Sequence, residues 1–162
     1  MTAAASIRLA DYTPWAFDLP DISLDVNIQS DHVVVASRLH LEPCRSGEPL
    51  QLCGVDLEIE SLAINQTPLS SEDYSFVDGL LSIPNVPTQP FVLETCCRLD
   101  PYSNSSLEGL YASGGLLSTQ CEAEGFRRIS LHPDRPDVLS RWRVRIEANS
   151  STCPVLLSNG NA

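Results

Sequence analysis

Apolar and polar residues alternate with a period of two along much of the first hundred residues. In PDISLDVNIQSD every second residue from Ile22 to Ile28 is apolar, and in HVVVASRLHLEP one face carries valines and leucines. Because successive side chains of a strand point to opposite faces, this alternation predicts two half-buried strands. The polar residues Gln29, Ser30 and Asp31 lie between them and predict a turn.

The same period continues, so the pattern predicts an all-β fold. Further strands are predicted in PLQLCGVDL, LEIESLAIN, YSFVDG, LLSIP and FVLETCCRLD, with turns at Asn65-Gln66, Asp78-Gly79 and Pro84-Asn85. No long amphipathic helix is present, and only PDRPDVLSRW predicts a helical turn, with Asp134 as its N-cap. We therefore expect a largely antiparallel β-sandwich or open β-sheet, with at most short helical turns, in one domain spanning residues 1–162.

A late strand is predicted in SRWRVRIEA. Trp142, Val144 and Ile146 share the inward face, and three arginines alternate with them on the outward face. The arginine row is either a solvated face or a surface that contacts another domain, and the alternation does not decide between the two.

The last residues predict a further strand, from Val155 to Leu157, that runs into Asn159-Gly160. Asn-Gly is the strongest short-range signal for a hairpin, and a hairpin needs a returning strand. Since the sequence ends at Ala162, we expect it to be part of a longer protein.

Composition narrows the function classes. The formal net charge is −11, so a nucleic-acid partner is not expected, because such proteins carry a basic footprint. No apolar run approaches the roughly 20 residues of a membrane span, and the first residues lack the apolar region of a secretory signal. None of the six cysteines is spaced as Cys-x-x-Cys. We expect a cytoplasmic protein with reduced thiols, no membrane association and Cys97 in the core.

Candidate chemistry is concentrated in STQCEAEGFRRI, residues 118–129. If this segment is extended, Gln120, Glu122 and Glu124 share one face, before a bend at Gly125. Carboxylates and an amide can accept hydrogen bonds from an ammonium group. The pattern is also that of an exposed polar edge, and the chemistry of these residues alone favours that reading. The chain holds no His-Glu-x-x-His zinc motif, no Gly-x-Ser-x-Gly and no glycine-rich phosphate loop, so neither a catalytic residue nor a metal ligand is assigned.

Three motifs give the chain a specific resemblance. They are LEGLY at 107–111, TQCEAEGFR at 119–127 and DRPDVLSR at 134–141, and LLSNGN at 156–161 also matches. With these motifs the chain resembles the N-terminal domain of bacterial aminopeptidase N, a family of zinc metallopeptidases. The resemblance is strong after Asp100 and looser before it.

The resemblance implies a function for the polar face. In the family this β-domain precedes a catalytic domain that binds Zn²⁺, and that domain is absent from this chain. Gln120 and Glu122 would bind the substrate, a peptide with a free amino terminus. Glu122 would hold the α-ammonium, Gln120 would make a secondary contact, and Glu124 would be structural. The chain alone should be inactive. The alternatives are a non-catalytic interaction domain of a relative that lacks the zinc motif, and a free-standing β-sandwich that binds a cationic ligand.

Overall fold

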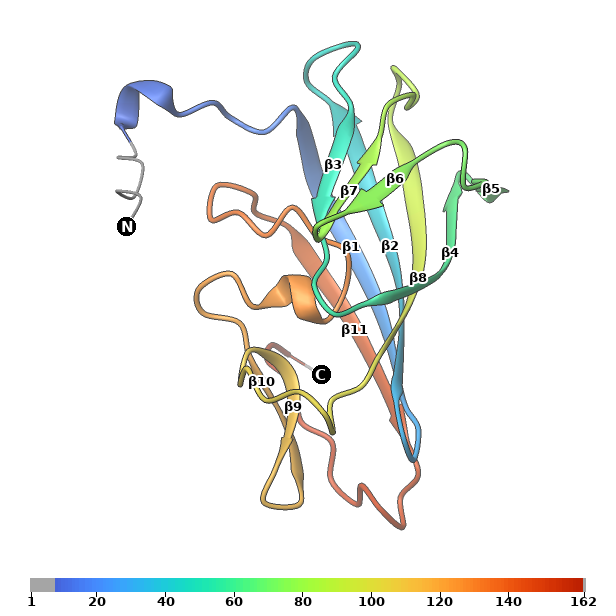
Figure 1. Cartoon of the computed structure of the whole chain (residues 1–162), viewed down its shortest axis with the longest axis vertical. Coiled ribbons are helices and arrows are strands. Elements are labelled where there is room, and N and C mark those ends of the chain that lie inside the picture. The colour runs from blue at the N-terminus through green and yellow to red at the C-terminus, as the bar shows by residue number, and fades with distance from the viewer. Residues whose placement is uncertain (1–7, 162) are drawn as a thin grey trace.

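A computed structural model describes residues 8–161 of the chain. Two β-sheets form a sandwich, and a separate hairpin lies beyond one end of it (Figure 1). The large sheet has six strands in the order β11-β1-β2-β8-β4-β5. These strands are β1 (Phe17–Ile28), β2 (Val33–Pro43), β4 (Glu58–Ile64), β5 (Thr67–Pro68), β8 (Phe91–Leu99) and β11 (Arg141–Ala148).

The small sheet has three strands in the order β3-β7-β6, and the hairpin has two. The strands of the small sheet are β3 (Leu50–Cys53), β6 (Ser75–Val77) and β7 (Leu80–Ile83). The hairpin strands are β9 (Gly109–Ser113) and β10 (Leu116–Gln120), and the two short 3-10 helices are η1 (Leu9–Asp11) and η2 (Phe126–Arg128). All strand pairs are antiparallel except β1 with β11. The predicted all-β, largely antiparallel fold is therefore confirmed.

The two-residue alternation in the sequence correctly predicts which side chains of the strands are buried. On β2 and β8 every second side chain is buried, and β3 and β7 contribute leucines and an isoleucine that are at most 1% exposed. The two sheets therefore enclose an apolar core, and β2 and β8 each contribute one buried polar residue to it. The hydroxyls of Ser37 and Thr95, which are neighbours across β2 and β8, hydrogen-bond to each other over 2.7 Å. This bond satisfies two buried polar groups that otherwise would destabilise the core.

The cysteines also follow the alternation. Cys97 is fully buried, and its neighbour Cys96 points to the other face of β8 and is partly exposed. All six cysteines are free thiols.

The edge strand β11 differs from its prediction in burial. Trp142 and Val144 lie on the core side of the large sheet, but they are 44% and 41% exposed. The reason is that β11 is the last strand of the sheet, paired on one side only. On the opposite face Arg141 and Arg145 contact Asp21 and Asp25 of β1 at 2.8 and 3.7 Å. Such exposed ion pairs add little stability.

Two local predictions near the end of the chain are wrong. Residues 133–142 form no helix but only a hydrogen-bonded turn, in which the Val138 N–H donates to the Arg135 carbonyl over 3.3 Å. Asp134 is not an N-cap, because its φ is +49° and its carboxylate bonds to Arg127 instead. The predicted strand from Val155 to Leu157 has irregular backbone. A strand needs a hydrogen-bonded neighbour, and within the described residues none lies beside this segment.

Candidate functional site

The candidate segment follows a tight hairpin. Strands β9 and β10 are joined by Gly114 and Gly115, whose φ angles of +58° and +83° suit a two-residue turn of the type that favours glycine. Strand β10 ends at Gln120, residues 122–125 form a turn, and η2 follows at Phe126. The hairpin therefore delivers the two predicted substrate-binding residues to an exposed turn at the end of a strand.

The structure changes how the three polar residues relate to one another. The extended alternation stops at Gln120, so Gln120, Glu122 and Glu124 do not share a strand face, and that expectation is wrong. Glu124 has a φ of +71°, and its carboxylate turns back to Arg127 at 3.3 Å. Gln120 stays beside Glu122, since its side-chain amide donates to the Glu122 carbonyl over 3.1 Å.

Two glycines let the turn approach the hairpin closely. A Cβ on Gly109 would lie 2.5 Å from the Cβ of Arg128, and a Cβ on Gly125 would lie 2.5 Å from the carbonyl oxygen of Gln120. Neither distance is compatible with a side chain. Gly125 also donates its N–H to the Cys121 carbonyl over 3.3 Å, which closes the turn. The backbone on both sides of Glu122 is thus packed against β9 and η2.

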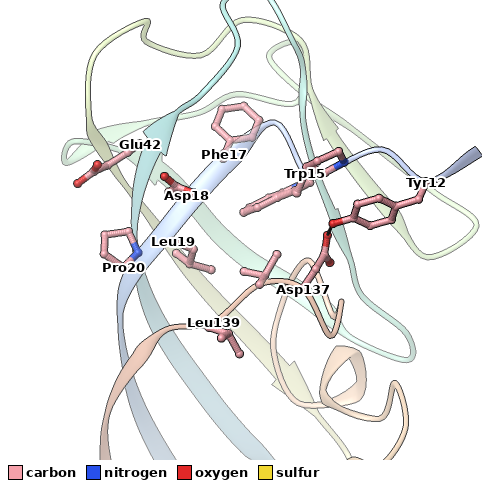
Figure 2. Close-up of a pocket in the computed structure, with 11 residues that line it drawn as sticks. Tyr12, Trp15, Phe17, Asp18, Leu19, Pro20, Glu42, Asp137 and Leu139 are labelled. Carbon is pink, nitrogen blue, oxygen red and sulfur yellow. Dashed lines mark hydrogen bonds between the residues drawn. The ribbon is translucent and has the colours of Figure 1, made fainter. Parts of the chain in front are cut away.

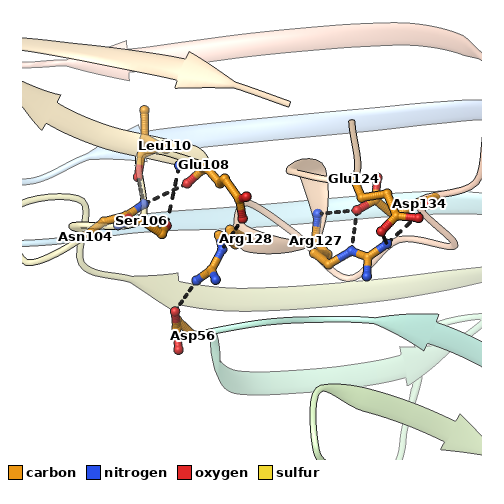
Figure 3. A network of polar contacts seen from close by, with 9 residues as sticks. All are labelled: Asp56, Asn104, Ser106, Glu108, Leu110, Glu124, Arg127, Arg128 and Asp134. Carbon is orange, nitrogen blue, oxygen red and sulfur yellow. Dashed lines mark hydrogen bonds and ion pairs between the residues drawn. The ribbon is translucent and has the colours of Figure 1, made fainter. Parts of the chain in front are cut away.

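The two arginines of η2 bind the carboxylates that surround the turn (Figure 3). Arg127 contacts Asp134 at 2.6 Å in addition to Glu124. Arg128 contacts Glu108 at 3.3 Å and also forms an ion pair with Asp56. Each guanidinium therefore bridges two carboxylates and ties η2 to neighbouring loops.

Among the described carboxylates around the turn, only that of Glu122 has no partner. Glu122 is exposed, and among the residues that the structure describes its carboxylate has no ion-pair or hydrogen-bond partner. Glu108, Glu124 and Asp134, by contrast, are all bound to arginine. A carboxylate without a partner keeps its full capacity to accept hydrogen bonds from an incoming cation.

The loop before β9 is braced by a single asparagine. The side-chain amide of Asn104 donates to the carbonyls of Glu108 and Leu110 at 2.8 and 2.9 Å, and its oxygen accepts from Ser106. These bonds are visible in Figure 3. They hold Glu108 where Arg128 meets it.

Sequence reasoning missed the role of His132. Its ring is only 7% exposed and packs against Phe126 and Trp142, with ring centroids 5.0 and 5.4 Å apart. Its Nδ1 accepts from the Asp134 N–H over 2.8 Å, and its Nε2 has no partner. Burial lowers the pKa of His132 to about 4. The ring is therefore neutral, and it packs beneath η2 through its contact with Phe126.

A separate groove lies between the N-terminal arm and the 137–139 segment (Figure 2). It has a volume of about 370 Å³ and is lined by Trp15, Phe17, Asp18 and Glu42, among others. Neither Gln120 nor Glu122 lines it. Its rim is held by Tyr12, whose hydroxyl donates to Asp137 over 2.9 Å.

Residues 8–161 contain neither a metal-binding cluster nor a membrane-spanning helix. No group of three or more histidine, cysteine, aspartate and glutamate side chains is arranged to hold a metal ion. No helix in this range has the length and apolar character needed to cross a bilayer.

The chain is a β-sandwich domain that presents an unpaired carboxylate on an anchored turn. Comparison with known proteins shows the family to which this domain belongs. The chain matches the model of the Peptidase M1 N-terminal domain over residues 18–162 and belongs to that family. It is 45% identical over 159 residues to aminopeptidase N of Caulobacter vibrioides and 41% identical over 152 residues to aminopeptidase N of Escherichia coli. The matches cover 96% and 93% of this chain but 18% and 17% of those proteins, so the chain spans less than a fifth of their length.

Solved structures agree with this assignment. The crystal structure of Legionella pneumophila aminopeptidase A in complex with aspartic acid matches with a TM-score of 0.86 and 32% identity, over 95% of this chain and 18% of that one. An M1 zinc metallopeptidase from Deinococcus radiodurans matches with a TM-score of 0.68 and 14% identity, over 81% of this chain and 32% of that one, which shows the shared fold. The predicted family resemblance is confirmed.

Proposed function

We propose that this chain is the N-terminal domain of a zinc aminopeptidase that removes amino-terminal residues from peptides. In this proposal the remaining part of the protein forms the catalytic domain, which binds Zn²⁺, and the β-domain contributes Glu122 and Gln120 to the substrate site. The relatives named above are aminopeptidases, and this supports the activity. When bound, zinc would polarise the scissile carbonyl and activate water.

The observation that carries the residue assignment is the uncommitted carboxylate of Glu122. It is exposed on a turn that is anchored on both sides, and the described arginines nearby are occupied by other carboxylates. A free α-ammonium carries one positive charge and three donors, so an unpaired carboxylate recognises it without reading the side chain. Gln120 lies beside Glu122 and would contact the first residue of the peptide.

The proposed recognition has a definite energetic scale. A hydrogen bond to a charged group contributes roughly 1.5–3 kcal/mol, and more where water is excluded. Holding the amino terminus also places the scissile carbonyl, so its loss would affect kcat as well as KM. The domain would therefore bind and orient the peptide, and would not itself take part in bond breaking.

The test is the charge-removing substitution Glu122→Gln in the full-length protein. We expect kcat/KM for an aminoacyl-p-nitroanilide to fall about 30- to 1000-fold, corresponding to roughly 2–4 kcal/mol. Glu124→Gln is the comparison variant. Glu124 bonds to Arg127 and is not free for substrate, so this change can act only by displacing the turn and should cost at most about tenfold. Gln120→Ala should be intermediate and depend on the first side chain of the substrate. Wild-type activity in Glu122→Gln together with a crippled Glu124→Gln would refute the assignment.

We further propose that the protein is cytoplasmic. Six free thiols, one of them fully buried, fit a reducing compartment. A non-catalytic interaction domain is the alternative function. The downstream sequence separates the two, because only the aminopeptidase requires His-Glu-x-x-His there.

A further inference from the structure

We infer that Arg127 and Asp134 are positioning residues for the Glu122 carboxylate. The inference rests on the proposed function and extends it to two residues that do not touch the substrate. It starts from the backbone of the turn. Glu124, two residues after Glu122, has a φ of +71°, in the left-handed region that non-glycine residues rarely adopt. That conformation costs an ordinary residue free energy and persists only when surrounding contacts hold it.

Arg127 supplies the contact that holds Glu124. Its guanidinium lies 3.3 Å from the carboxylate of Glu124, which is three residues earlier in the chain. Arg127 is itself fixed at its backbone, because its carbonyl accepts from the Val55 N–H over 2.8 Å. The arginine therefore joins the turn to the loop after β3.

Asp134 fixes the orientation of Arg127. One oxygen of its carboxylate accepts from both the Nε and the backbone N–H of Arg127, at 2.6 and 3.2 Å. The Asp134 side chain is 10% exposed and that of Arg127 is 24% exposed, so water weakens this pair less than a surface pair. The Asp134 N–H is in turn bonded to the buried ring of His132. A continuous set of contacts thus runs from the protein interior to the turn that carries Glu122.

The same loop offers a matched control pair. Arg135 and Asp137 also form a close arginine–carboxylate pair, at 2.7 Å. This pair holds the segment before β1 through the Thr13 carbonyl and the Tyr12 hydroxyl, and none of its hydrogen bonds or ion pairs within the described residues involves the turn. Asp137→Asn should therefore reduce stability without altering recognition of the ammonium.

The experiment measures ammonium recognition separately from the rest of the site. The full-length protein is titrated calorimetrically with leucine hydroxamate and with its des-amino counterpart, 4-methylpentanoyl hydroxamate. The ratio of the two affinities reports the contribution of the α-ammonium. Wild type, Glu122→Gln, Asp134→Asn, Asp137→Asn and the double variant Glu122→Gln/Asp134→Asn are compared, with folding checked by thermal melts.

We expect Glu122→Gln to abolish most of the difference in affinity between the two hydroxamates. Asp134→Asn should lower the ratio of the two affinities roughly tenfold, since a small misplacement of a positioned group is costly. Asp137→Asn should stay within about twofold of wild type, and Asp134→Asn should have no further effect in the Glu122→Gln background, because residues that act through one another are not additive.

The outcomes separate the two claims. An unchanged ratio in Glu122→Gln overturns the proposed function and this inference with it. If the affinity ratio falls in Glu122→Gln but keeps its wild-type value in Asp134→Asn, the positioning role alone is overturned. An equal loss in Asp134→Asn and Asp137→Asn also overturns it, because the effect would then be one of general stability. If Asp134→Asn does not fold, Arg127→Lys, which keeps the charge and loses the bridging geometry, decides the question by the same criteria.

Discussion

The close approach of β9 to η2 can be tested by adding one methyl group at Gly109. Its φ is +69°, and a Cβ there would lie 2.5 Å from the Cβ of Arg128 and 3.2 Å from the Gly125 carbonyl oxygen. Both neighbours belong to or adjoin the backbone, so they cannot rotate away. Gly109→Ala should therefore force η2, and with it the turn that carries Glu122, away from the hairpin.

The magnitude follows from two separable costs. Placing alanine at positive φ costs about 1–2 kcal/mol, partly offset by about 0.4–1 kcal/mol from the less flexible unfolded chain. Overpacking adds about 1–3 kcal/mol. Gly114→Ala isolates the first cost, because Gly114 has a φ of +58° and nothing within 4 Å of its Cβ position. We expect a loss of about 1 kcal/mol for Gly114→Ala and about 2–4 kcal/mol for Gly109→Ala.

The assay is urea unfolding of the chain, followed by tryptophan fluorescence. Trp142 packs against Phe126 of η2 with ring centroids 5.0 Å apart. Both variants are made in a Trp15→Phe background, so that the emission reports the displaced element. Equal losses of stability in the two variants would show that η2 does not lie against Gly109, and the account of how the turn is anchored would be refuted.

Two further predictions concern buried titratable groups. Because burial lowers the pKa of His132 from 6.5 to about 4, the unfolded chain binds a proton between these values that the native chain does not. The free energy of unfolding should therefore be highest above pH 6.5 and fall towards pH 4, by up to about 3 kcal/mol. In urea titrations at several pH values, His132→Asn should flatten this dependence. An unchanged pH dependence in His132→Asn would contradict the buried position of the ring. Burial also raises the pKa of Cys97 to about 11. Iodoacetamide at neutral pH should therefore modify exposed Cys44 in the native protein and Cys97 only after unfolding, as read by mass spectrometry. Labelling of both at one rate in the native protein would place Cys97 outside the core.

The alternation along the chain determined the strands and their faces. Side chains of a strand alternate for local steric reasons, so the period in residues 22–41 and 91–99 predicted which residues enter the core without knowledge of the partners. The turn at Asp78-Gly79 was predictable for the same reason, since both residues adopt positive φ. Gln120 and Glu122 were likewise predicted as candidates, because their chemistry and the family motif are properties of a short segment.

The tertiary structure decided which polar groups are free and which apolar groups are covered. Arg128 pairs with Asp56, 72 residues away, and Arg127 with Asp134 rather than with Glu122. No local period encodes these pairings, because they depend on which loops the packed sheets bring together. The exposure of Trp142 was undetermined for a similar reason: a strand pattern gives the direction of a side chain, but only the position of β11 at the edge of the sheet leaves that side chain partly uncovered.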